Sequence, residues 1–250
     1  MKRYFSVFLT LALTLALQAQ QLPNFGFDTW SKSGGAWNLY AKNTPEGQRV
    51  WDTANHGLSI LGINGTVPEY EHVAAAGEGK AAVKMVSRKA FGKFVAGNLY
   101  TGRFVRVVKL SGAEMLYGVP FQGRPKSLSG YIHYIPEVVD QAKKPCLDRK
   151  GKTDIARIEV VLTDWTAPYD FTSNDGNFMD NATDPSVIGR GYLDISEDTG
   201  GYIPVEIPIR YRSDRKPTYV HITLTSSRDG GYFTGGTGST LYADEFRFNY

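Results

Sequence analysis

Three groups of aromatic and polar side chains combine flat apolar faces with hydrogen-bonding groups. Aromatic faces stack on the C–H surfaces of sugar rings, while amides, acids and imidazoles bond the hydroxyl groups. One group lies in the segment 163–189, the second in WDTANHG and the third on one face of SLSGYIHYIP. Their members are Trp165, Tyr169 and Asp164, then Trp51, Asn55 and His56, and finally Tyr131 and His133.

The competing interpretation for each tryptophan is burial in the hydrophobic core. Trp165 fits that interpretation least well, because no alternation of apolar and polar residues surrounds it. The segment 163–189, TDWTAPYDFTSNDGNFMDNATDPSVIG, is long and polar, and we expect a loop there. A loop of this length in a compact domain is usually functional or disordered. Trp165 and Tyr169 are therefore the first choice for a stacking platform, and Trp51 is the second.

Catalytic chemistry is less clearly indicated. Glycoside hydrolysis needs two carboxylates about 5–10 Å apart across the sugar. Several acids are available, but their spacing selects no pair: Glu114, Glu137, Asp140, Glu159 and Asp164. The four histidines lack the H-E-x-x-H spacing of a zinc site, and no G-x-S-x-G stretch is present. The sequence therefore identifies no catalytic residues.

The glycine-rich stretch RDGGYFTGGTGST near the C-terminus is not a phosphate-binding loop. It lacks the G-K-[ST] ending, and no helix is predicted after it. We expect its glycines to serve tight turns and close backbone approach beside the last strand.

Alternation of apolar and polar residues predicts the elements that must position these groups. In TDIARIEVVLTDW, for example, Ile158 and Val160 share one face, and Arg157 and Glu159 share the other. Similar patterns recur in YIPVEIPIRY and PTYVHITLTSS. In the first of these stretches, Pro208 indicates an edge strand or a bulge. Long amphipathic helices are not predicted. We expect an all-β fold, a two-sheet antiparallel jelly-roll sandwich forming a single domain over residues 20–250.

The first 19 residues predict export. Lys2 and Arg3 precede an apolar run that is too short to span a membrane comfortably, which is typical of a cleaved signal peptide. We expect a periplasmic, outer-membrane-surface or secreted protein. Removing Lys2 and Arg3 lowers the formal charge from +3 to +1, and scattered basic residues argue against nucleic acid as a partner. The lone Cys146 forms no intrachain disulfide.

Several blocks spread from end to end resemble a known family. NFGFDTWS, WDTANHG, GNLYTGRF, RPKSLSGYIHYIP and SSRDGGYFTGGTGSTLYADEF look like the putative carbohydrate metabolism domain of gut Bacteroidetes. The resemblance implies an exported β-jelly roll linked to glycan use, and it supplies no settled catalytic residues.

The two ends of the mature chain also resemble jelly-roll carbohydrate-binding modules. Those modules often open with Asn-Gly-x-Phe-Glu and close with an Asp-Asp-Val type strand, and acids from the two adjacent strands hold a structural calcium ion. The resemblance implies calcium bound by Asp28 and Asp244, although Asp28 stands where glutamate is commoner. The alternative is that Asp28 caps a turn and Asp244 pairs with a lysine or arginine.

Together these features predict an exported glycan-binding or glycan-processing accessory protein of a carbohydrate-utilisation system, with an oligosaccharide or polysaccharide as its partner. Two alternatives stay open. The chain could be a glycoside hydrolase or lyase-type enzyme that uses a carboxylate pair, or a cell-surface assembly protein that binds other proteins and no glycan.

Overall fold

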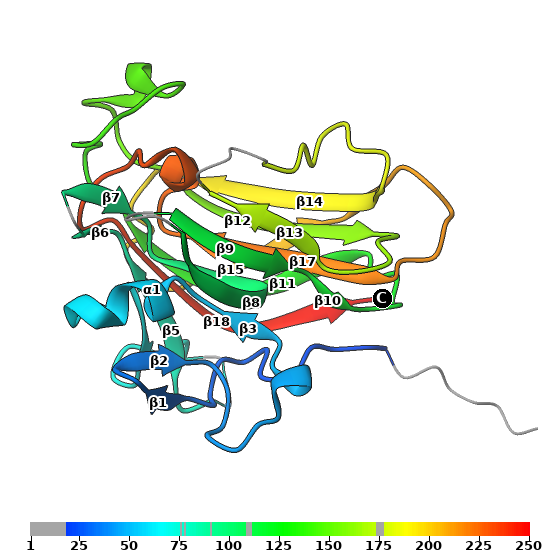
Figure 1. Cartoon of the computed structure of the whole chain (residues 1–250). Helices are drawn as coiled ribbons and strands as arrows, with labels where there is room; N and C mark the ends of the chain where they lie inside the picture. Colours follow the sequence, from blue (N-terminus) through cyan, green and yellow to red (C-terminus); the bar gives the residue numbers. More distant parts are fainter. Residues whose placement is uncertain (1–18, 76, 78, 91, 109–111, 174–177) are drawn as a thin grey trace, which may run out of the picture.

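Two antiparallel β-sheets enclose the hydrophobic core (Figure 1). The computed structural model describes residues 19–75, 77, 79–90, 92–108, 112–173 and 178–250, so all but the last residue of the predicted signal peptide lies outside the described residues. Within them, the large sheet has nine strands and the small sheet five. The predicted all-β, two-sheet antiparallel jelly-roll sandwich is confirmed.

The large sheet runs in the order β13-β9-β8-β17-β12-β14-β16, with β3 paired to β8 and β10 to β17. Its strands are β3 (Trp51–Asp52), β8 (Asn98–Val108), β9 (Gly112–Tyr117), β10 (Val119–Pro120), β12 (Ala156–Thr163), β13 (Tyr169–Thr172), β14 (Val187–Ile195), β16 (Arg210–Tyr211) and β17 (Tyr219–Thr225).

The small sheet runs in the order β15-β11-β18-β5-β4. Its strands are β4 (Thr66–Glu69), β5 (Ala82–Val86), β11 (Ser127–Ile135), β15 (Ile203–Pro208) and β18 (Thr240–Asn249). β15 is an edge strand, and this position agrees with the expectation from Pro208, because proline cannot donate a hydrogen bond to a neighbouring strand.

Several short elements lie outside the two main sheets. They are the hairpins β1 (Ser31–Ser33) with β2 (Ala36–Asn38) and β6 (Arg88–Ala90) with β7 (Lys93–Val95), helix α1 (Asn55–Leu58), and the 3-10 turns η1 (Glu46–Gln48), η2 (Ser59–Leu61), η3 (Leu147–Arg149) and η4 (Arg228–Tyr232). No helix in the described part of the chain is long and apolar enough to cross a membrane.

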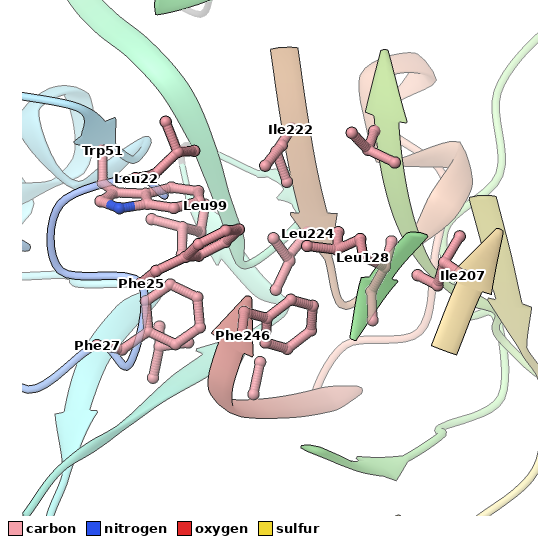
Figure 2. Packing of buried hydrophobic residues seen from close by; sticks show 14 of the residues in the cluster. Leu22, Phe25, Phe27, Trp51, Leu99, Leu128, Ile207, Ile222, Leu224 and Phe246 are labelled. Carbon is pink, nitrogen blue, oxygen red and sulfur yellow. The ribbon is translucent and has the colours of Figure 1, made fainter. Parts of the chain in front are cut away.

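The core is built from the alternating apolar faces of both sheets. Ile158 and Val160 on β12 and Ile222 on β17 are fully buried from the large sheet. Leu128 and Ile132 on β11 face them from the small sheet. At one end of this core, aromatic residues of the N-terminal segment pack against β18, as Figure 2 shows for Phe25, Phe27, Trp51 and Phe246.

A β-bulge in β18 explains the two adjacent acids near the C-terminus. The pairing of β11 with β18 shifts between Ser129 and Tyr131, and Glu245 takes a left-handed backbone with φ of 50°. The extra residue lets both Ala243 and Phe246 reach the core, although they are three positions apart. Asp244 and Glu245 therefore lie together at the point where the N-terminal segment meets the last strand.

Candidate functional site

A cleft of about 370 Å³ lies on the outer face of the large sheet, opposite the core. The alternation of β17 creates its floor: Val220, Ile222 and Leu224 point into the core, so His221 and Thr223 point into the cleft. On the neighbouring β12, Arg157 and Glu159 reach the cleft for the same reason. The polar strand faces predicted from the sequence thus become the floor of one hollow.

Aromatic rings from two paired strands form a wall of the cleft. β13 pairs with β9 in a register that places Tyr169 opposite Tyr117. The ring of Trp165 stacks on Tyr169 with a centroid distance of 5.5 Å, and Tyr117 stacks on Phe171 at 5.2 Å. The segment 163–189 is therefore not the uniform loop that its composition predicts, because β13 within it extends the large sheet. The first-choice platform, Trp165 with Tyr169, does line the cleft.

The indole of Trp165 is held in place from several sides. The indole Nε1 donates a hydrogen bond of 2.9 Å to Ser186 Oγ. The backbone carbonyl of Trp165 accepts a second hydrogen bond, of 2.6 Å, from Thr218 Oγ1. A Cβ atom on Gly118 would lie 2.8 Å from the indole ring, and the φ of Gly118, +89°, also favours glycine. The absence of a side chain at this position thus makes room for the ring.

Asp164 does not share the cleft with its neighbour. Its carboxylate forms an ion pair with Arg215, and it lines a separate, more open depression on the other side of Trp165 and Tyr169. The predicted group of three is therefore divided, because a carboxylate engaged by a guanidinium has fewer oxygens left for sugar hydroxyls.

The floor of the cleft combines hydrogen-bonding groups with a neutral histidine. Glu159 accepts a hydrogen bond of 2.6 Å from Arg190, and Thr223 Oγ1 lies 2.9 Å from His221 Nε2. Burial lowers the pKa of His221 to about 4, so its imidazole is uncharged at neutral pH. Tyr117 stacks on this imidazole at 4.5 Å. The floor therefore offers hydroxyl and carboxylate oxygens beside a flat aromatic surface.

One carboxylate lies in the part of the cleft lining that the structure describes. Among the described residues that line it, Glu159 is the single acid. Glu114 and Asp140 pair instead with Arg106 and Lys89, and Glu137 lies outside the lining as well. Hydrolysis in either stereochemical course uses two carboxylates, so the described lining identifies no such pair.

The glycine-rich stretch closes one end of the cleft. η4 supplies Arg228, Gly230 and Gly231 to the lining, and Phe233 follows with a left-handed backbone of φ 54°. A Cβ atom on Gly230 would lie 2.5 Å from Ala96, so the loop packs closely there, as expected for its glycines.

The second-choice group, Trp51 with Asn55 and His56, is corrected by the structure. Trp51 is 1% exposed and packs on Phe25 with a centroid distance of 5.5 Å, so its ring faces are not accessible to a sugar (Figure 2). The Asn55 side-chain amide forms hydrogen bonds with backbone groups of Trp37 and Thr66. These two residues are structural, because long-range packing directs them inward.

His56 lies just behind the rim of the cleft. Its ring stacks on Phe104, which lines the cleft, at 6.0 Å, and its Nε2 lies 3.6 Å from the carboxylate of Asp52. His56 itself is not part of the lining.

Tyr131 and His133 lie on the outer face of the small sheet, on the opposite side of the sandwich from the cleft. His133 Nδ1 is 2.7 Å from His72 Nε2, and its ring stacks on Tyr242 at 5.3 Å. The structure therefore does not bring this pair together with Trp165 and Tyr169.

Asp28 and Asp244, the acids proposed for calcium, both lie where the N-terminal segment meets β18. Asp28 Oδ1 accepts hydrogen bonds from the backbone N–H groups of Lys80 and Ala81, and Asp244 Oδ2 accepts one from Ala74. A Cβ atom on Gly79 would touch the carboxylates of both Asp28 and Glu245, so these two face one small space.

One buried oxygen at this position has no partner. Asp244 Oδ1 makes no hydrogen bond in the described structure, and burial together with the nearby carboxylates raises the pKa of Asp244 to about 6. An oxygen-preferring cation would relieve both conditions. Within the described residues, however, no three His, Cys, Asp or Glu side chains already lie in a metal-binding arrangement. The donors suit calcium, provided that backbone carbonyls complete the site.

Comparisons with known proteins identify the family and support the fold. Residues 26–249 match the family described as "Putative carbohydrate metabolism domain". A protein of Bacteroides thetaiotaomicron, described as a putative glycoside hydrolase, superposes with a TM-score of 0.68 and 22% identity, over 90% of this chain and 70% of that protein. A Bacteroides vulgatus protein of the same description gives a TM-score of 0.67 and 16% identity, over 90% of this chain and 96% of the other. No curated protein matches the chain.

Proposed function

Because the chain belongs to the putative carbohydrate metabolism domain family, we propose that it binds an oligosaccharide in the cleft of the large sheet. The observation that carries the proposal is the facing of an aromatic wall, Trp165 and Tyr169, with a polar floor that includes Glu159 and Thr223. Sugar rings present both an apolar face and a rim of hydroxyls, so they match this pair of surfaces. The cleft volume lies within the range of small-molecule binding sites.

The test is binding by a purified stacking-ring variant. An array of neutral and acidic oligosaccharides identifies a bound probe, which is then titrated calorimetrically against wild type and Trp165→Ala. Removing the ring is expected to cost roughly 1–3 kcal/mol, or about 5- to 150-fold in Kd. Trp37→Ala is the matched control, because Trp37 is also partly exposed but lies on β2 outside the lining.

Two results would refute the proposal. If Trp165→Ala and Trp37→Ala weaken binding equally, the cleft is not the site. If no oligosaccharide on the array binds, the result favours the alternative of an assembly protein that binds another protein. Product analysis by mass spectrometry of the same incubations addresses the enzyme alternative. We expect intact oligosaccharide, because Glu159 is the single acid among the described lining residues.

Export and calcium belong to the same proposal. The basic and apolar start of the chain supports secretion, and mass spectrometry of the exported protein should find an N-terminus at or near Gln20. We also propose that Asp28, Asp244 and Glu245 hold a structural calcium ion. It would supply positive charge between carboxylates that otherwise repel one another.

A further inference from the structure

The end of the cleft that η4 closes carries an exposed aromatic ring. Phe178 lines the cleft there and is 37% exposed. Its ring lies 5.2 Å from that of Phe171 and 4.7 Å from that of Tyr232, at interplanar angles of 48° and 44°. Because neither neighbour lies parallel to the Phe178 ring, neither covers a whole face of it. This ring therefore offers an apolar face to a ligand in the cleft.

Phe178 is accommodated in the same way as Trp165. A Cβ atom on Gly231 would lie 2.8 Å from the Phe178 ring, just as a Cβ atom on Gly118 would lie 2.8 Å from the indole. The nearest atoms are Cε1 and Cζ of Phe178, and Cζ3 and Cε3 of Trp165, so each glycine meets the edge of its ring. A ring that is held by its edge keeps a face for stacking.

Aromatic side chains along the wall connect these two rings. Trp165 lies 5.5 Å from Tyr169, and Phe171 lies 5.2 Å from Phe178. Tyr169 and Phe171 are alternate residues of β13, so they lie on the same face of the strand, about 7 Å apart. Together these steps separate the ring of Trp165 from that of Phe178 by at most about 18 Å.

The floor gives a similar length. The ring of Tyr219, at the start of β17, is 6.3 Å from that of Trp165. Phe178 packs instead against η4, which follows the end of β17 at Thr225. The strand from Tyr219 to Thr225 spans about 20 Å. Because both routes give roughly 15–20 Å, a single sugar cannot reach both rings, whereas a chain of about three units can.

Polar groups lie between the two rings. Thr223 on β17 is directly opposite Glu159 on β12, and both line the cleft. Asn181, which follows Phe178 closely in the chain, adds a side-chain amide to the same lining. The hydroxyl groups of a bound chain therefore meet hydrogen-bonding side chains between one stacking ring and the other.

We propose, on the basis of the binding function above, that Phe178 is a second stacking residue and that the cleft selects oligosaccharides of about three or more sugar units. One sugar ring stacks on Trp165, and another, further along the same chain, stacks on Phe178. The separation of the two platforms sets the minimum chain length.

The experiment measures affinity against chain length. The probes are size series, from disaccharide to hexasaccharide, of cello-, xylo- and galacto-oligosaccharides, together with the size series of any glycan that the array selects. Each is titrated calorimetrically. For a series that binds, the tetrasaccharide is expected to bind wild type about tenfold more tightly than the disaccharide, because only the longer chain gains the second stacking contact. Affinity should level off beyond the length that reaches both rings.

Variants locate the second contact. Phe178→Ala should reduce the gain from disaccharide to tetrasaccharide to about twofold or less, and Trp165→Ala should do the same, since either change leaves one platform. Phe178→Tyr keeps a flat ring and should keep the gain. Phe178→Leu keeps apolar bulk without a flat face and should lose it. Tyr192→Ala is the control, because Tyr192 is 52% exposed on β14 but lies outside the lining.

Gly231→Ala tests the seat of the ring without removing the ring. The backbone of Gly231 is not in the left-handed region, so alanine is tolerated there, but its methyl group would displace Phe178. The gain with chain length should therefore fall. Thermal unfolding of each variant, followed by circular dichroism, verifies that the protein is folded.

The outcomes separate the two proposals. If disaccharide and tetrasaccharide bind wild type alike, or if Phe178→Ala or Phe178→Leu keeps the full gain, the second platform is overturned and the cleft stays a glycan site through Trp165. If Trp165→Ala binds every probe like wild type, the cleft is not the site and both proposals fall. If no series and no array member binds, the proposed function fails, and the inference fails with it.

Discussion

Trp51 and Trp165 should respond to truncation in opposite ways. Trp51 is 1% exposed, packs against Phe25 and Phe27 at 5.5 Å, and donates a hydrogen bond of 2.9 Å to the carbonyl of Pro23. Replacing a buried tryptophan with alanine costs about 3–5 kcal/mol in the free energy of unfolding. For a domain of this size that corresponds to a fall in Tm of roughly 6–20 °C.

Trp165→Ala should be much milder for stability. The ring is partly exposed and its main polar bond is the one to Ser186. We expect a loss of about 1 kcal/mol, or roughly 2–4 °C in Tm. Glycan binding, in contrast, should fall with Trp165→Ala.

The assay is thermal unfolding followed by circular dichroism, with urea titration as a second measure of the free energy. Trp51→Phe serves as the graded control, because it keeps an aromatic ring in the same space and should lose less than Trp51→Ala. If Trp51→Ala melts like wild type, or if Trp165→Ala loses as much as Trp51→Ala, the division into a core tryptophan and a site tryptophan is refuted.

Three further predictions follow from the same contacts. Chelation should lower the Tm of wild type but not of Asp244→Asn, since a cation that binds only the folded state stabilises it by mass action; an equal response of both proteins would exclude this site. The pKa of His221, about 4, lies below the value of about 6.5 for an unfolded imidazole, so its contribution to stability is full above about pH 6.5 and is lost as pH falls toward 4. Tm should therefore fall less between pH 7 and pH 4.5 in His221→Gln than in wild type, and an unchanged slope would contradict this prediction. The raised pKa of Asp244 makes stability change with pH in the opposite direction. Because Asp244 is present in both proteins, the difference between their Tm slopes reports the imidazole. Gly118→Ala should weaken glycan binding, because the new methyl group collides with the indole of Trp165, and titration with normal affinity would show that the ring moves aside freely.

Much of the fold could be predicted because strand faces are encoded locally. The alternation around Ile158 and Ile222 correctly separates core from cleft, and Pro208 correctly indicates an edge. β13 could not be predicted in this way. Its four residues, Tyr169–Thr172, form a strand through pairing with β9, more than 50 positions earlier in the chain. Such non-local partners leave no periodic signal in the segment itself.

The site was only partly predictable for a related reason. Trp165 and Tyr169 are visible as aromatic residues in a polar segment, whereas Tyr117, His221 and Arg228 come from β9, β17 and η4 and meet only in the folded sheet. Their strand positions indicate an exposed face, but not which face is hollow.

Trp51 misleads for the opposite reason. Its neighbours Asp52, Asn55 and His56 are polar, yet packing of the N-terminal segment turns the indole inward. The apolar and polar pattern around Trp51 cannot predict its contact with Phe27, because the two residues are 24 positions apart in the chain.

The position of β18 bears on how the protein is made. This strand is the centre of the small sheet, bonded to β11 on one side and β5 on the other, yet it begins only at Thr240. Hydrogen bonds between Gln21 and Phe248, and between Gln20 and Tyr250, join positions more than 220 residues apart, so both ends of the described chain lie side by side (Figure 1).

Contacts of this range make folding slow, because a large loop must close before the contacts can form. A nascent chain that has reached residue 239 already carries β5 and β11 with unpaired edges facing the gap that β18 will fill. Exposed edges of this kind recruit other chains, so the interval before Thr240–Asn249 emerges is when aggregation threatens most. Supplying a synthetic peptide of residues 240–250 to a chain truncated after Ser239 would rescue soluble protein if this order of assembly holds.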